Sequence, residues 1–174
     1  MNKTRNLIMG AVIFVLSSWS QANAQVNKGT HESILNISPS VITKSQKAFA
    51  EGSVCYIWGE SNISVKPVTD GIEIGPFFVL SYKQPIQYKT WITIPGQIFG
   101  TGPHSANPST ADTFKITLSK KQMSGNGKIS IQLLGFGAMG SSYAGKMISN
   151  IIEIEVDINK NEVVFLSKDY FENK

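Results

Sequence analysis

Arginine is nearly absent from this sequence of 174 residues, and its one occurrence, Arg5, lies close to the N-terminus. Apart from the two histidines, every other basic side chain is a lysine. Bidentate recognition of phosphate groups and of guanine normally uses the planar guanidinium group of arginine. We therefore expect no nucleic-acid partner and no phosphoryl-transfer chemistry.

Cysteine is equally scarce, because Cys55 is the only thiol in the chain. A single cysteine forms no internal disulfide, so the folded domain depends on its hydrophobic core. Cys55 lies in the apolar run Ser53–Trp58, and no histidine is close to it in the sequence. This setting favours a buried, inert thiol over a nucleophile.

Long hydrophobic runs are also missing, since a membrane-spanning helix needs about 20 apolar residues and no run reaches that length. The shorter run Leu7–Leu16 follows Lys3 and Arg5 and precedes Ala22-Asn23-Ala24. This order is typical of a bacterial secretory signal peptide, with a retained N-terminal anchor as the alternative. We predict a signal peptide over residues 1–24 and a single β-rich domain over residues 25–174. The protein is then exported to the periplasm, the cell surface or the medium, and it is not transmembrane after processing.

Short apolar runs separated by Gly, Pro, Asn and Ser recur along residues 25–174, as is typical of all-β domains. The predicted strands are Ile34–Ile37, Ser53–Trp58, Ile63–Lys66, Phe77–Tyr82, Ile86–Ile94, Thr113–Leu118, Lys128–Leu134, Ile151–Ile158 and Val163–Leu166. At most one short helix, over Thr43–Glu51, accompanies them. So many short strands in one domain predict an all-β fold of two packed sheets, a β-sandwich of Ig-like or jelly-roll type. A closed β-barrel is the alternative.

The clearest strand signal is strict alternation in two segments, Thr113–Leu118 and Ile152–Ile158. In the second, aliphatic residues alternate with Glu153, Glu155 and Asp157. Alternation places the aliphatic side chains on a core and the acids on the solvent side. We therefore interpret the acids as the hydrated face of a sheet, not as a glycosidase pair or a calcium site.

Gly135–Gly140 matches the G-x-G-x-x-G pattern of dinucleotide-binding proteins. That fold needs crossover helices, whereas the residues upstream read as short strands and little chain remains after Asp157. We expect the glycines to bend the chain at a bulge or tight loop, and we expect no cofactor. The segment Gly140–Gly145 and the strand after it resemble the end of bacterial pilin-type sandwiches. The chain departs from that pattern by lacking a disulfide and by ending in a charged tail, Asp169–Lys174.

Residues suited to catalysis are few and far apart in the sequence. The two histidines, His31 and His104, belong to no metal-binding motif, and the chain has no G-x-S-x-G nucleophile elbow. We expect no catalytic residue, no metal site and no enzymatic activity. A Ser-His-Asp site that uses His104 and Asp112 is the catalytic alternative.

The segment Pro95–Ser109 reads as a long connection, and long connections within compact domains tend to be functional or mobile. It contains apolar and aromatic residues with no evident strand pairing. We predict that Ile98, Phe99 and His104 contact a ligand or partner. A disordered connection is the alternative.

Lysines dominate the middle of the chain, where seven lysines and one acid lie between Lys83 and Lys146. If these lysines share one face of the domain, that face attracts anionic groups. The alternative is that the lysines are dispersed over the surface, where they only confer solubility.

Together these patterns predict an exported, non-catalytic interaction protein, such as a bacterial adhesin, a pilus-type subunit or a glycan-binding β-sandwich. Its partner is then a protein or an anionic glycan. The alternative is a soluble periplasmic inhibitor or immunity protein that binds a hydrolase.

Overall fold

The computed structural model describes residues 32–33, 37–123, 126–137, 141–166 and 170–171. Its elements are β1 (Glu32–Ser33), α1 (Pro39–Ala50), β2 (Cys55–Val68), β3 (Gly71–Ser81), β4 (Ile86–Ile94), β5 (Gln97–Phe99), β6 (His104–Ala106), β7 (Thr110–Ser119), β8 (Asn126–Phe136), β9 (Ile152–Asp157), β10 (Glu162–Phe165) and β11 (Tyr170–Phe171). The prediction of an all-β fold with one helix is confirmed for these residues.

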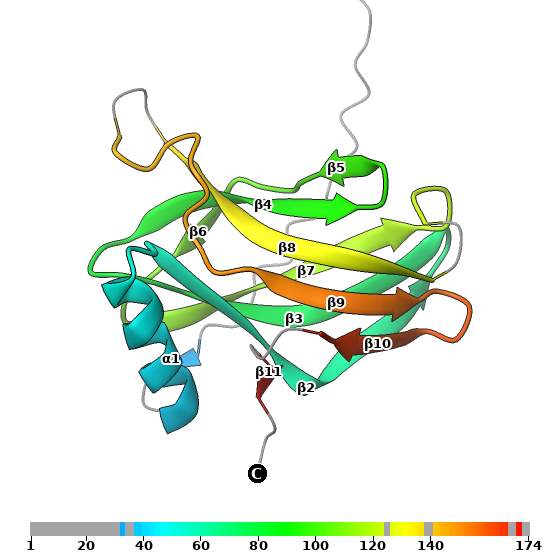
Figure 1. Ribbon diagram of the computed structural model, residues 1–174, viewed down its shortest axis with the longest axis horizontal. Helices are drawn as coiled ribbons and strands as arrows, with labels where there is room; N and C mark the ends of the chain where they lie inside the picture. The colour runs from blue at the N-terminus through cyan, green and yellow to red at the C-terminus, as the bar shows by residue number, and fades with distance from the viewer. Residues whose placement is uncertain (1–31, 34–36, 124–125, 138–140, 167–169, 172–174) are drawn as a thin grey trace, which may run out of the picture.

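The strands form two sheets that are antiparallel throughout, except that β11 runs parallel to β2. The first sheet has the order β1-β7-β3-β2-β11, and the second has the order β10-β9-β8-β4-β5 with β6 also paired to β4. In Figure 1, β8 and β9 of the second sheet lie in front of β3 and β7 of the first. The described strands do not close into a ring, so the alternative of a closed barrel is wrong.

One hydrophobic core lies between the two sheets and receives alternate side chains from both. In the first sheet these include Ile74 and Ile116, and in the second Ile92, Ile131 and Ile154, all fully buried. Successive side chains of a strand point to opposite faces, so the predicted alternation of β7 and β9 becomes one buried and one outward row. The core therefore confirms which face of each alternating segment is inward.

The outer face of the first sheet carries a second hydrophobic cluster beneath α1. Side chains from β2 and β3, among them Tyr56, Trp58 and Phe78, pack there against Val41 and Phe49 of the helix. Strands with both faces buried have continuous apolar sequences instead of alternating ones. This explains the uninterrupted apolar runs in β2 and β3.

The helix begins four residues before the predicted Thr43, at Pro39. The backbone carbonyl of Ser38 accepts hydrogen bonds from the N–H groups of Val41 and Ile42, at 2.9 and 3.2 Å. Proline is favoured in the first turn because its missing N–H has no helical partner there and its φ already suits a helix. The Ser38-Pro39 pair was thus a start signal that the strand-based interpretation overlooked.

Two elements differ most from the predicted strands, β2 and β3. β2 joins the predicted Ser53–Trp58 and Ile63–Lys66 into one strand, with a register shift between Gly59 and Ser64. β3 begins six residues before Phe77 and passes through Pro76, where its register with β7 shifts. A central strand accommodates a proline only at such an irregularity.

The predicted strand Ile34–Ile37 is not observed as such. Residues 34–36 lie outside the described residues, and Ile37 belongs to no strand but to the cluster under α1. The short strand β1 lies just before this segment and pairs with β7. Burial under the helix, and not pairing in a sheet, explains the apolar side chain of Ile37.

Candidate functional site

The segment Pro95–Ser109 is not a loop without pairing, as the sequence suggested, but forms the short strands β5 and β6. Both strands lie antiparallel to β4 and extend the edge of the second sheet. A two-residue turn, Pro95-Gly96, reverses the chain into β5, and Gly96 has a φ of 76°, which glycine adopts without a steric penalty. The Pro-Gly pair was the sequence signal for this hairpin.

The three predicted contact residues do not converge on one site. Ile98 points to solvent and is 55% exposed, whereas Phe99 is partly buried against the main core. Phe99 pairs in register with Ile92, and His104 pairs with Tyr88, both of which are inward residues of β4. Of the three, only Ile98 is therefore presented to a partner by this structure.

His104 lies in a partly buried polar cluster at the β4 edge. Its Nε2 atom is 3.1 Å from Oγ1 of Thr101, and that oxygen is 2.8 Å from Oγ1 of Thr90. Its ring also packs against the ring of Tyr88, with centroids 5.4 Å apart. Burial lowers the pKa of His104, so the ring is neutral at neutral pH and tied to its neighbours by packing and hydrogen bonding.

The second member of the catalytic alternative, Asp112, is buried and accepts a hydrogen bond from Nδ2 of Asn107 at 3.0 Å. Cys55 is also fully buried, and burial raises the pKa of its thiol to about 12. A thiol with so high a pKa is almost entirely protonated at neutral pH, and the protonated form is a poor nucleophile. The prediction of a buried Cys55 is confirmed.

The acids of β9 lie on the solvent side of the second sheet, as predicted. Glu153 and Glu155 are exposed, and Asp157 is 3.6 Å from Nζ of Lys160 in the following turn. Within the described residues, no three His, Cys, Asp or Glu side chains are grouped closely enough to hold a metal ion.

The glycine-rich segment also has a local structural role. Residues 138–140 of the motif lie outside the described residues, but Gly135, the residue before the last of β8, lies against residues 143–146. Its N–H donates to the carbonyl of Lys146, and a Cβ atom at Gly135 would overlap the carbonyl oxygen of Tyr143. The described residues 141–151 form turns and bridges and no helix, so they do not complete a dinucleotide-binding unit.

A shallow depression lies beside β5. Its volume is about 400 Å³, and it is lined by Thr93, Ile94, Gly96, Gln97 and Ile98. It is open to solvent and has few polar groups directed into it. The depression alone therefore defines no small-molecule site.

The outer face of the second sheet carries an apolar surface that the sequence reasoning did not identify. We define the open-face patch as the outward side chains of Trp91, Leu134, Phe136, Met147 and Ile151. Three of these are well exposed, with exposed fractions of 37% for Phe136, 44% for Met147 and 46% for Ile151. Contiguous apolar surface of this kind marks interaction sites more often than isolated exposed residues do.

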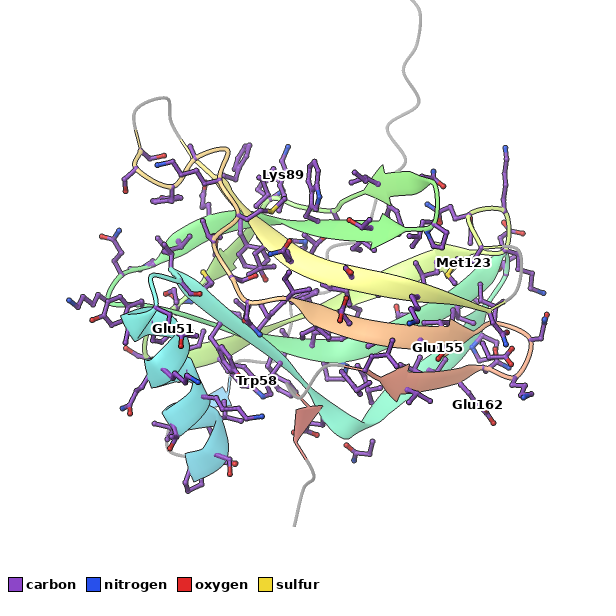
Figure 2. All side chains as sticks on the ribbon, in the orientation of Figure 1. Glu51, Trp58, Lys89, Met123, Glu155 and Glu162 are labelled. Carbon is purple, nitrogen blue, oxygen red and sulfur yellow. The ribbon has the colours of Figure 1, made fainter. Side chains whose placement is uncertain are left out.

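The strand register brings the open-face patch together. Trp91 of β4 lies opposite Gln132 of β8, and Leu134 of β8 forms a bridge with Met147. Lys89 lies at the margin, with its Nζ atom 4.7 Å from the centre of the Phe136 ring. Figure 2 shows Lys89 projecting from the β4 side of the sheet, far from Glu155 and Glu162.

Comparison with known proteins gives no relative, because the chain matches no family model, no curated protein and no solved structure. Among the described residues, no helix combines the length and the apolar character needed to cross a bilayer. The arguments about function therefore depend on the surface of this molecule itself.

Proposed function

We propose that this protein is an exported, non-catalytic interaction protein, an adhesin, pilus-type subunit or related β-sandwich of Ig-like or jelly-roll type, and that it binds through the open-face patch. The observation that supports this proposal is the exposure of Phe136, Met147 and Ile151 together on one sheet face. The residues first predicted to bind are separated, and only Ile98 among them is exposed. The patch therefore replaces the segment Pro95–Ser109 as the proposed binding surface.

The composition of the patch favours a protein partner. Aromatic residues and methionine are enriched in the centres of protein interfaces, where their apolar surface is removed from water. The open-face patch combines Trp91, Leu134 and Phe136, which the paired strands β4 and β8 hold in place, with Met147 and Ile151 from the segment before β9. A rigid surface loses little conformational entropy on binding.

Site-specific photocrosslinking tests the proposal in the exported protein. The photoreactive residue p-benzoylphenylalanine is placed at Ile151 in one variant and at Val68 in a control variant. Val68 is 40% exposed, close to the 46% of Ile151, but lies at the β2–β3 hairpin of the first sheet. We expect a protein adduct from position 151 and none from position 68 in intact cells. Equal yields at the two positions, or no adduct from position 151, would contradict the proposal.

The identity of the adduct distinguishes the forms of this proposal. A surface or pilus protein in the adduct supports the adhesin form, whereas a periplasmic hydrolase supports the inhibitor or immunity-protein alternative.

Amino-terminal sequencing of the exported protein tests processing after Ala24 in the same preparation. A chain that retains residues 1–24 would contradict the predicted signal peptide.

An anionic glycan is a second candidate ligand, which the pairing of Lys89 with Phe136 favours. An ammonium group beside an aromatic ring offers one group for an anion and one surface for a sugar ring. Titration with a sulfated polysaccharide tests this, and the Lys89→Gln variant is expected to bind it more weakly than the parent protein. Equal binding by the two proteins would exclude a glycan at this position.

A further inference from the structure

The three-residue pattern Asn-x-Ser/Thr, with x other than proline, is the acceptor motif for N-linked glycosylation of exported proteins. The pattern occurs three times in the sequence, at Asn2, Asn36 and Asn62. A fourth candidate, Asn107-Pro108-Ser109, is excluded by its proline. Asn2 lies in the predicted signal peptide, so Asn36 and Asn62 are the acceptors that an exported chain would retain.

The residues that precede the two asparagines distinguish them. Glu60 stands two positions before Asn62, whereas Ile34 stands two positions before Asn36. Bacterial oligosaccharyltransferases select an acidic residue at that position, in addition to the hydroxyl residue that follows the asparagine. Of the two acceptors, only Asn62 therefore satisfies this longer motif.

Asn62 lies at an irregularity of β2. The register between β2 and β3 shifts between Gly59 and Ser64, and Asn62 is exposed within that interval. The next residue, Ile63, packs against the main core and anchors the chain at this point. Such an irregularity interrupts the regular ladder of a sheet, so an enzyme reaches its exposed side chain more readily than one in an unbroken ladder.

The edge of β2 next to Asn62 is open. β11 pairs with β2 only at Gly59 and Glu60, so residues 62–68 have no strand partner along that edge in the described part of the chain. Figure 1 shows β2 bending close to β11. A substituent on Asn62 therefore disrupts no strand pairing along this edge that the structure describes.

The motif at Asn36 has a different setting. Asn36 itself lies outside the described residues, but Ile37 is buried beneath α1. The carbonyl of Ser38 accepts two hydrogen bonds from the first turn of that helix. The described part of this motif is thus packed against the helix, whereas Asn62 is exposed.

We propose that Asn62 is an N-glycosylation site of the exported protein. Its Nδ2 atom forms a bond to the anomeric carbon of a sugar that is carried on a lipid diphosphate. The bond between that carbon and the diphosphate breaks, and the lipid diphosphate leaves with the electron pair. Nδ2 transfers one of its protons to a base of the transferase, and the hydroxyl group of Ser64 completes the motif that the transferase recognises.

The inference rests on the export that the proposed function includes, but not on the open-face patch. Asn62 belongs to the first sheet, whereas the patch lies on the outer face of the second. Glycosylation of Asn62 and binding through the patch can therefore be tested separately.

Mass spectrometry of the exported protein, purified from the cells that naturally produce it, tests the inference. We expect the intact mass to exceed that of the chain from Gln25 to Lys174 by the mass of a glycan. Fragmentation of the peptide that contains Asn62 is expected to place the addition on that residue.

Three variants show whether the acceptor motif is responsible. Asn62→Gln and Ser64→Ala are each expected to abolish the addition at residue 62. The matched control, Ser64→Thr, keeps a hydroxyl group at the same position and is expected to retain it. Circular dichroism of every variant verifies that the folded state is retained.

The outcomes separate this inference from the proposed function. An exported chain that is processed after Ala24 but unmodified at Asn62 overturns the inference and leaves the open-face patch as a proposed binding surface. An addition that persists in Ser64→Ala, or is lost in folded Ser64→Thr, also overturns it. A chain that retains residues 1–24 and carries no glycan rejects both the inference and the proposed export. A glycan on Asn62 together with equal crosslinking from positions 151 and 68 supports the inference and rejects the patch.

Discussion

The outer face of the first sheet lies under α1, whereas the outer face of the second sheet is covered by no helix in the described part of the chain. Both faces carry a tryptophan that points away from the shared core: Trp58 on β2 and Trp91 on β4. Trp58 is buried in stacking contacts with Tyr56 and Phe78, at centroid distances of 5.9 and 5.4 Å. Trp91 remains half-buried as part of the open-face patch. Similar outward residues thus stabilise the fold on one face and are available for binding on the other.

The largest predicted difference between the two faces is in the free energy of unfolding that is lost when each tryptophan is replaced. Trp58→Ala removes a buried indole from a packed cluster and is expected to lower the free energy of unfolding by about 3–5 kcal/mol. Trp91→Ala leaves no closed cavity and is expected to cost roughly 1 kcal/mol or less. Urea denaturation followed by circular dichroism measures both. Equal losses would show that the second face is packed as tightly as the first.

A second comparison concerns two neighbouring residues of β5, at the edge of the second sheet, and the stability that each side chain contributes. Phe99→Ala is expected to cost about 2 kcal/mol, roughly half the value for a fully buried phenylalanine, because its ring is partly buried against the core. Ile98→Ala is expected to change stability by less than about 0.5 kcal/mol because the side chain faces solvent. Urea denaturation followed by circular dichroism measures the free energy of unfolding of both variants. A negligible loss for Phe99→Ala would restore the original view of this segment as a free binding loop.

A smaller effect concerns pH and His104. Because burial lowers its folded-state pKa below the usual value of about 6.5, the unfolded chain takes up the proton first as pH falls. This contribution to stability is complete above about pH 6.5 and is lost as pH falls through that value towards the folded-state pKa. His104→Gln is expected to reduce the loss of stability between about pH 8 and pH 5.

The parent protein is the control for this experiment, because His31 and every other side chain except residue 104 are common to the two proteins. Only the difference between the two denaturation series reports on His104. Identical pH dependence in the parent protein and the variant would show that His104 exchanges its proton as freely in the folded state as in the unfolded one.

The smallest effect is predicted at the start of the helix that covers the first sheet. Ser38 precedes α1, but its side chain makes no capping hydrogen bond, and only its backbone carbonyl is used. Ser38→Ala is therefore expected to change the free energy of unfolding by less than about 0.5 kcal/mol, below the roughly 1 kcal/mol typical of a capping serine. A thermal denaturation series measures the change. A loss of 1 kcal/mol or more would indicate a side-chain cap in solution.

Much of the strand content could be predicted because period-two alternation is a local property of the sequence. Ile86–Ile94 is β4 with the predicted bounds, and the strands around Ile116, Ile131 and Ile154 differ from prediction only at their ends. The prediction missed the early part of β3 because Gly75-Pro76 reads locally as a turn. Pairing with β2 and β7 on either side carries the strand through that irregularity.

The candidate site was the least predictable part of the molecule. Ile98, Phe99 and His104 are neighbours in sequence, but pairing with β4 turns Phe99 and His104 inward and Ile98 outward. The open-face patch instead combines Trp91 with residues more than forty positions later in the chain, such as Phe136 and Ile151. No local pattern reports which distant strand will lie next to β4.

The sequence by itself determined the scarcity of arginine and cysteine, because composition depends only on residue type. It also determined the alternation that builds the two sheets and the charges that β4, β8 and β9 carry outward, because these follow from a period of two along each strand. Only the tertiary structure decided which outward face α1 would cover and which would stay exposed. That choice depends on strand order and on the chain path between Ser38 and Cys55, which bring Val41 and Phe49 onto Trp58 and leave Trp91 uncovered by a helix. Burial is a property of neighbours in space, and strand pairing over long sequence separations sets those neighbours.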